Sequence, residues 1–454
     1  MSSNVNQESK VFPRNMARKS LIMASKGDGA WIVDQYGERY LDASGGAFVS
    51  ILGHQIPEVA EKISHQIEQL NFCYSGDFTS PILETASQQL IDIAPDNISH
   101  AILTTSGSTA NEAAIKLARQ YHIARGNEQK SIVISRMHSY HGSTLGALSM
   151  TGSMPRRKPF TPNVNAFPKV APPNTYRNDL GLNDEQFMLH CANEFEQVIK
   201  AHGSEYISAI ILEPIAGSPL GALVSEDIYL QRVREICNQY DVLLIIDEVV
   251  SGMGRSGDWF AIKKSGVRPD IITLAKGLGG GYIPVGAVLC DQTIYQLLDS
   301  VNSSFVHSES FTGHILGAAA VSAVIEYISD HHVLERVKEL SVLLHEKLSK
   351  FYDLPLVGTI RGRGVLFGIE FVVDKTSKVP FPRSQKVAEG IAEIARNKGV
   401  VFITGNAAVD GVNGDTIMIS PPYTVSDQEV ELMLDILYES INQYTASLDK
   451  IRRA

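Results

Sequence analysis

The sequence predicts an α/β fold in which a mostly parallel sheet lies between helices. Residues 242–246 form a short, continuous apolar run, which is typical of a strand buried on both faces of a parallel sheet. Stretches with helical spacing, such as residues 57–70 and 226–240, separate this run from similar ones. A chain of 454 residues exceeds what one small core can hold, so we expect two or three intertwined domains.

The composition argues against a nucleic-acid-binding protein. The chain is 44% hydrophobic and 20% charged, which is ordinary for a soluble protein, and its net charge is −10. No basic run is long enough for nucleic acid. A short basic cluster, residues 156–158, stands in a proline-flanked loop, and we interpret it as a solvated turn rather than an anion site.

The cysteines and the start of the chain favour a cytoplasmic location. The four cysteines lie far apart, without a CxxC pair or metal-ligand spacing, which indicates apolar fillers in a reducing compartment. The first ten or so residues are polar, lack the apolar core of a signal peptide, and are expected to be disordered or arm-like. No apolar stretch approaches the ~18 residues needed to span a bilayer.

The N-terminal elements follow from turn signals and periodicity. A hairpin is expected at residues 31–41, with its turn at Tyr36-Gly37. A helix is expected over residues 57–70, because a proline opens it and four apolar residues share one face: Val59, Ile63, Ile67 and Leu70. The loop at residues 72–78 carries three aromatics, which would line either a substrate pocket or a subunit interface.

The later elements alternate between strands and helices. A strand and helix joined by a tight turn are expected over residues 101–125, and further strands at 131–135, 206–212, 242–246, 270–275 and 286–290. From about residue 330 the pattern changes to that of a small α+β domain, with helices at 332–351, 384–398 and from 426, and strands at 365–373 and 416–419.

A lysine and a carboxylate end two of the central strands. The run 242–246 leads into Asp247, and the strand 270–275 leads into Lys276, which glycines follow at 277 and 279–281. Open α/β sheets bind ligands beyond the carboxyl ends of their strands, so both side chains should reach the same rim. A lysine amine forms Schiff bases with carbonyls, and pyridoxal phosphate enzymes pair such a lysine with an acid for the pyridinium nitrogen. If Asp247 is considered alone, the simpler interpretation is that it caps a helix or turn. If Lys276 is considered alone, it is a solvated surface residue. The two together, each at a strand end, favour a cofactor site.

Two stretches carry a resemblance to a known family. IIDEVVSGMGRSGDWFA (245–261) and ITLAKGLGGGYIPVGAVL (272–289) resemble the class III aminotransferases, of the pyridoxal phosphate fold type I. The resemblance covers the chain from about Gly29 to the 430s. It implies an aspartate-aminotransferase-like fold with a mostly parallel seven-stranded sheet. It also implies three segments: residues 1–56 as the N-terminal part of a small domain, 57–329 as a large cofactor-binding domain, and 330–454 as the C-terminal part of the small domain.

The resemblance also implies roles around a pyridoxal 5′-phosphate cofactor. Lys276 would form the Schiff base and carry protons, while Asp247 would hold the pyridine nitrogen. Val249 and Tyr140 would pack on opposite faces of the ring. His141 would shape the site rather than act as the base.

Further residues take implied roles at the phosphate and the substrate. Within SGSTANE, Gly107 and Ser108 would bind the phosphate at a helix N-terminus, although such a sequence is more often a simple N-cap. Ser310, with Thr312 as a rival, would reach the phosphate of the neighbouring subunit. This implies a homodimer with shared active sites. The sequence does not determine whether two such dimers form a tetramer. Phe48 is either a pocket aromatic or a core residue.

The sequence departs from the family where substrate carboxylates are bound. Many relatives carry an arginine where this chain has Met418, and it pairs with the glutamate equivalent to Glu213. Others use a mobile arginine from the preceding loop, yet residues 399–415 contain none. Since an arginine fork is the natural partner of a carboxylate, we expect an amine or ω-amino donor, with Glu213 free to receive its ammonium group. A keto acid such as pyruvate or 2-oxoglutarate would accept the amino group, its carboxylate bound by a group not identified from sequence.

Two alternatives remain open. The same scaffold would serve a racemase, an aminomutase or a lyase, because the cofactor carries the chemistry. Of these activities only transamination requires a keto acid. A non-catalytic regulator that binds the cofactor is the second alternative, but it would need no intact lysine and no DNA-binding segment is evident.

Overall fold

The computed structural model describes residues 10–12 and 21–453. Most of the polar N-terminal stretch that was expected to be arm-like therefore lies outside the described residues. Within the described part of the chain, no helix combines the length and the apolar character needed to cross a membrane.

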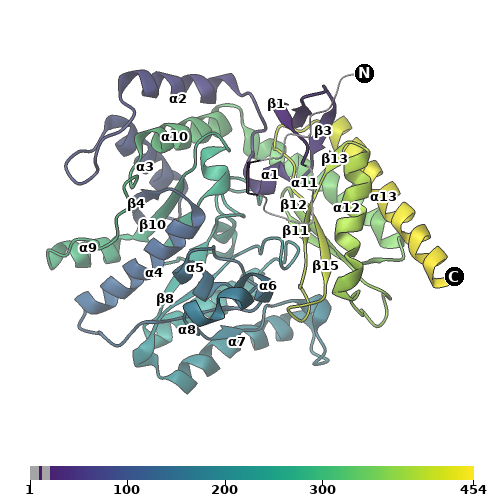
Figure 1. Cartoon of the computed structure of the whole chain (residues 1–454). Helices are drawn as coiled ribbons and strands as arrows, with labels where there is room; N and C mark the ends of the chain where they lie inside the picture. The colour runs from purple at the N-terminus through teal and green to yellow at the C-terminus, as the bar shows by residue number, and fades with distance from the viewer. Residues whose placement is uncertain (1–9, 13–20, 454) are drawn as a thin grey trace.

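A seven-stranded sheet forms the centre of the larger part of the structure (Figure 1). Its strands lie in the order β4 (Ile98–Thr104), β10 (Gly286–Asp291), β9 (Ile271–Leu274), β8 (Leu243–Asp247), β7 (Ile207–Leu212), β5 (Ile132–Arg136) and β6 (Lys169–Val170). The strands from β9 to β6 are parallel, and β10 runs antiparallel to both of its neighbours. The predicted mostly parallel seven-stranded sheet is confirmed.

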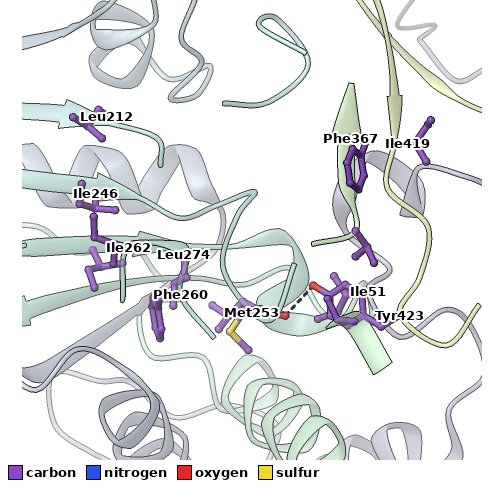
Figure 2. Packing of buried hydrophobic residues seen from close by; sticks show 14 of the residues in the cluster. Ile51, Leu212, Ile246, Met253, Phe260, Ile262, Leu274, Phe367, Ile419 and Tyr423 are labelled. Atoms are coloured by element: carbon purple, nitrogen blue, oxygen red, sulfur yellow. Dashed lines mark hydrogen bonds between the residues drawn. The ribbon is translucent and has the colours of Figure 1, made fainter. Parts of the chain in front are cut away.

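Helices cover both faces of this sheet, which is why its central strands are mostly apolar. On one face, α4 (Gly107–Ala124) presents a small-residue stripe that includes Ala110, Ala114 and Leu117. The other face packs against α2 (Pro57–Gln69), α3 (Pro81–Ile93), α7 (Asp184–His202), α8 (Asp227–Tyr240) and α10 (Ile315–Asp330). Figure 2 shows Leu212, Ile246 and Leu274, from β7, β8 and β9, in this second core.

The two ends of the chain lie together beside the seven-stranded sheet (Figure 1). The N-terminal strands β1 (Ala24–Asp28), β2 (Trp31–Asp34) and β3 (Arg39–Asp42) form one sheet with β13 (Val400–Val401), which pairs in parallel with β3. A second sheet contains β11 (Val357–Arg363), β12 (Leu366–Phe371), β15 (Asp415–Ile419) and β14 (Ile403–Gly405). Helices α11 (Val333–Ser349), α12 (Val387–Asn397) and α13 (Asp427–Arg453) complete this half. The segment limits at residues 57 and 330 stay a prediction.

The helix predicted over residues 57–70 is confirmed as α2, which ends at Gln69. Val59 and Ile63 are buried, whereas Ile67 and the following Leu70 are 51% and 44% exposed, because only the first part of this helix packs into the core of the single chain. Residues 357–363, which were not expected to be a strand, form β11, because β12 offers them a complete antiparallel edge despite their glycines and charges.

We expect Ile246→Ala to lower the free energy of unfolding by about 2–5 kcal/mol, because Ile246 is fully buried in β8 and its truncation leaves a cavity. Urea-induced unfolding followed by circular dichroism measures this change. The control, Val342→Ala, removes a side chain that is 68% exposed on α11 and should change stability by less than about 0.5 kcal/mol. Equal losses in both variants would contradict the assigned core.

Candidate active site

A cavity of about 420 Å³ opens beyond the carboxyl ends of the parallel strands. Its size is within the range of small-molecule sites. Eight of the side chains singled out from sequence line it together: Gly107, Ser108, Tyr140, His141, Glu213, Asp247, Val249 and Lys276. They follow β4, β5, β7, β8 and β9, so the parallel strands bring residues up to 169 positions apart to one rim.

Lys276 is the amine of this cavity. It follows β9 directly, with a backbone φ of 50°, a conformation that few non-glycine residues adopt and that is common at functional sites. Burial lowers the pKa of its ammonium group to about 8, although the charges of Asp247 and Glu213 act in the opposite direction. Roughly a tenth of the amine is therefore unprotonated at pH 7, far more than at the ordinary lysine pKa of 10.5, which favours Lys276 as a nucleophile for carbonyl groups.

The carboxylate of Asp247 is held rigidly at the end of β8. Its Oδ2 accepts a hydrogen bond from Asn111 Nδ2 at 2.9 Å and lies 2.8 Å from His141 Nδ1. Its Oδ1 accepts from the backbone N–H of Val249 at 3.0 Å. Three donors fix the direction of this carboxylate, and His141 acts on it as an orienting group, in line with the site-shaping role expected of that residue.

Asn111 is a site residue that the sequence analysis missed. It lies in the second turn of α4, where Thr273 donates to its Oδ1 at 2.8 Å and its Nδ2 also donates to the His141 carbonyl at 2.7 Å. Asn111 is 1% exposed. A buried asparagine amid the alanines of an otherwise apolar helix face was the available signal, because a buried amide needs specific partners.

The N-terminus of α4 borders the same cavity. Ser106, not Ser108, is the N-cap: its Oγ accepts from the N–H of Thr109 at 3.2 Å. Gly107 leaves space that a side chain would fill, since a Cβ there would lie 3.1 Å from Val249 and 3.3 Å from Ala275. The first N–H groups of a helix have no intrahelical acceptors, so this end of the cavity favours an anion such as a phosphate.

Glu213 is not free, contrary to the expectation that it would receive a substrate ammonium group. The fully buried Arg136 donates to Glu213 Oε2 at 3.2 Å and to the Glu213 carbonyl. The N–H of Tyr140 donates to Glu213 Oε1 at 3.2 Å. In this chain Arg136, on β5, therefore supplies the glutamate's arginine partner, while Met418 is buried in an apolar cluster with Phe48.

The interpretation of residues 156–158 as a solvated turn was wrong for the first two of them. Arg156 and Arg157 are half-buried at the end of the short helix α6 (Met154–Arg157). The Arg156 guanidinium lies over the ring of Tyr140, with its carbon 4.3 Å from the ring centroid. The sequence could not reveal this contact because it depends on how the chain returns to the strand end after α5 (Leu145–Met150).

Three predicted residues do not line the cavity. Phe48 is buried, but its ring lies 5.2 Å from Lys276 Nζ, so it belongs to the core and also borders the amine. Ser310 is exposed, and Thr312 is half-buried and accepts a hydrogen bond from the N–H of Glu309. Their predicted role toward a neighbouring subunit stays a prediction.

Comparison with known proteins identifies the family. The family model for aminotransferase class-III matches residues 13–441. The chain belongs to the class III aminotransferases. It is 34% identical to the uncharacterized aminotransferase YodT of Bacillus subtilis, over 94% of this chain and 96% of that one. The adenosylmethionine-8-amino-7-oxononanoate aminotransferase of Methanocaldococcus jannaschii is 32% identical, over 94% and 93% of the two chains.

Solved structures agree with this assignment. A thermostable (S)-enantioselective omega-transaminase from Thermomicrobium roseum superposes with a TM-score of 0.88 at 31% identity, over 97% of this chain and 96% of that one. The omega transaminase from Pseudomonas jessenii in complex with PMP gives a TM-score of 0.90 at 28% identity, over 96% and 97%. The protein is thus an aminotransferase of fold type I, which moves an amino group from an amino donor to a keto acid. Class III aminotransferases are pyridoxal phosphate enzymes.

A second carboxyl group of this aminotransferase lies beneath the site. Burial raises the pKa of Glu248 to about 7, although Ser251 and the N–H of Ile262 donate to its oxygens. The group is 1% exposed and points into the protein rather than into the cavity lining. It binds the loop after β8 to the short helical turn at Ala261–Ser265.

Glu248 should make stability depend on pH. In the unfolded chain its carboxyl group ionises near the ordinary pKa of 4.5, and in the folded protein near about 7. Between these values only the folded state keeps the proton, so the stabilisation is complete below about pH 4.5 and is lost as the pH rises to about 7. Glu248→Gln cannot ionise, so its free energy of unfolding should rise relative to wild type by about 3 kcal/mol over this window.

Chemical denaturation of both proteins between pH 4.5 and 7 measures this difference. Asp258→Asn, at an exposed position on the loop that follows, serves as the control and should leave the pH dependence unchanged. A constant difference between Glu248→Gln and wild type across the window would contradict the raised pKa.

Proposed function

We propose that this aminotransferase binds pyridoxal 5′-phosphate in the cavity at the strand ends and transfers an amino group from an amine or ω-amino acid to a keto acid such as pyruvate or 2-oxoglutarate. The observation that carries the proposal is the meeting of three groups in one cavity. These are the Lys276 amine with its lowered pKa, the fixed Asp247 carboxylate, and the N-terminus of α4.

The residues present fit this cofactor. Lys276 would bond to its aldehyde, and Asp247 would hold its ring nitrogen in the protonated form. Gly107 and Ser108 would bind its phosphate, where Gly107 keeps the space that a Cβ would fill. Tyr140 and Val249, which both line the cavity, would contact the two faces of its ring. When bound, the cofactor supplies a carbonyl that carries the amino group and a ring that accepts electrons.

The chain's own residues would then move the protons. Nζ of Lys276, once released from its bond, would take the proton from the α-carbon of the donor and deliver it back to the reacting centre. Its lowered pKa supports this task, because an amine that titrates near the working pH both accepts and releases protons readily. Asp247 would keep its direction throughout, since Asn111 and His141 hold it.

The donor class follows from the polarity of the substrate side. Relatives that bind α-carboxylates use an arginine at the position of Met418, which here is fully buried among apolar side chains. Glu213 is occupied by Arg136, so the donor's far end would meet apolar surface. This supports an amine or ω-amino donor. Turnover of ornithine or another α-amino acid well above that of ω-amines would contradict it.

We expect Lys276→Ala to abolish transamination by more than the ~10²–10⁴-fold effect of a single acid–base group, because it removes both the cofactor's anchor and the proton carrier. The test begins with an absorbance spectrum of the wild-type protein with pyridoxal phosphate. A visible cofactor band that bleaches on adding an amine, and returns with pyruvate, supports the proposal. Loss of this band in Lys276→Ala would show that the cofactor is attached to Lys276.

Other outcomes separate the alternatives. Turnover that needs no keto acid would favour a racemase, aminomutase or lyase. The absence of any band in wild type after incubation with the cofactor would overturn the proposed binding site. Lys263→Ala, on the surface turn after β8, is the control and should keep the wild-type spectrum.

The proposal includes a homodimer with shared sites in the cytoplasm. The loop at 72–78 and the segment before α10 expose aromatic side chains beside each other: Phe72 and Phe311, whose ring centroids are 5.8 Å apart, with Phe78 at 65% exposure nearby in sequence. Clustered exposed aromatics are typical of protein interfaces. Ser310 adjoins this cluster, which supports its predicted reach to the neighbouring phosphate. The sparse, mostly buried cysteines support a reducing location.

We expect light scattering to give a mass twice the chain mass of 49.6 kDa. Phe72→Glu combined with Phe311→Glu should shift the protein toward monomer and reduce activity, because it would place two carboxylates within the exposed aromatic cluster proposed as the interface. The control Tyr36→Glu changes an aromatic that is 77% exposed on the N-terminal hairpin and should keep the mass. A monomeric, fully active wild-type protein would contradict the shared site.

A further inference from the structure

The cavity lacks an arginine of its own, although the proposed acceptor carries a carboxylate. Among the described residues that line the cavity, Lys276 is the only lysine or arginine. In the proposed function its amine bonds to the cofactor's carbonyl group, so it does not serve as the partner of a carboxylate. The two arginine positions that relatives use are Met418 and the arginine-free loop at 399–415. The carboxylate of a keto acid therefore needs another partner at this site.

Two arginines lie close enough to Lys276 for their charges to lower its pKa, Arg156 and Arg255. Arg255 is fully buried, and its Nη1 donates to the carbonyls of Ser420 and Pro421, at 3.2 and 2.8 Å, whereas its Nε and Nη2 have no hydrogen-bond partner among the described residues. Its carbon also lies 4.8 Å from the ring centroid of Tyr423, and the nearby Asp42 compensates its charge. Arg255 thus fastens the larger part of the structure to the C-terminal segment.

Arg156 is in a different position. It is half-buried, and within residues 10–12 and 21–453 its side chain forms neither a hydrogen bond nor an ion pair. Its carbon lies 4.3 Å from the centroid of the Tyr140 ring, and Tyr140 lines the cavity. A guanidinium that contacts an aromatic ring keeps its N–H donors available for a planar anion.

The backbone fixes this arginine relative to the site. Gly152 and Ser153 both donate to the carbonyl of Ser139, at 3.0 Å each, so the segment before Arg156 is fastened beside Tyr140. Gly152 permits this approach, because a Cβ there would lie 2.1 Å from the Arg136 carbonyl and 2.6 Å from the N–H of His138. The N–H of Arg156 then donates to the Ser153 carbonyl and closes the turn.

We propose that Arg156 binds the carboxylate of the keto-acid acceptor at the edge of Tyr140 and so determines which acceptors this aminotransferase uses. The inference rests on the proposed function, since it names a substrate contact of that same reaction. It gives the acceptor a carboxylate partner from α6, in place of the arginines found in relatives at other positions. An ω-amino acid that enters as donor would use the same contact.

The test compares two acceptors, pyruvate and propanal, which lacks a carboxylate. In Arg156→Leu, KM for pyruvate should rise about 10- to 100-fold, as expected for a lost hydrogen-bonded charge pair, while KM for propanal and kcat with propanal change little. Arg156→Lys should recover part of the affinity for pyruvate, because it keeps the charge without the fork.

Arg157→Leu is the matched control. Arg157 adjoins Arg156 and is also half-buried, but its charge acts on Lys169, whose pKa burial lowers to about 7. This variant should leave the ratio of the two acceptors unchanged. If Arg156→Leu instead slows both acceptors equally, Arg156 only supports Tyr140 and the proposal is overturned.

A binding measurement separates this inference from the proposed reaction. Calorimetric titration of pyruvate into wild type, Arg156→Leu and Arg157→Leu needs no turnover. If pyruvate binds more weakly to Arg156→Leu but not to Arg157→Leu, the carboxylate contact is supported. This conclusion holds even if the wild-type protein transfers no amino group, a result that would refute the proposed function only. Equal pyruvate binding in all three proteins overturns the role of Arg156, whatever the activity.

Discussion

The active site depends on where the parallel strands end. Strands β5, β7, β8 and β9 are covered by helices on both faces, so their side chains are mostly apolar, and polar exceptions such as Arg136 and Thr273 are hydrogen-bonded. Charged groups find more room beyond the carboxyl ends, and parallel strands all end at one edge. The same packing that limits polar residues within the sheet therefore concentrates them at one rim, within reach of a single cavity.

Burial at that rim sets the chemistry of each group. Asp247 and Glu213 are compensated by partners of their own, namely Asn111, His141 and Arg136. Their charges raise the pKa of Lys276 less than burial lowers it, which leaves the amine near pKa about 8. The hydrogen bonds around the two acids hold them in fixed directions toward the cavity.

Pairing of buried charges also determines which residues surround the substrate. In this chain Arg136 forms the ion pair with Glu213 from within the sheet, so no arginine is needed at position 418 and that position joins an apolar cluster. The remaining uncompensated arginine of this region, among the described residues, lies over Tyr140 on α6.

The sequence by itself determined the fold class, the family, and the residues at the strand ends, because buried strands, strand–turn–helix motifs and the lysine with its glycines are local patterns. Eight predicted residues line one cavity for that reason. Only the tertiary structure decided which side chains contact one another. Asn111, Arg136 and Arg156 come from a helix face, a strand and a short turn far from Lys276 in sequence. Their roles depend on distances between side chains, and no local pattern encodes the partner of a buried charge.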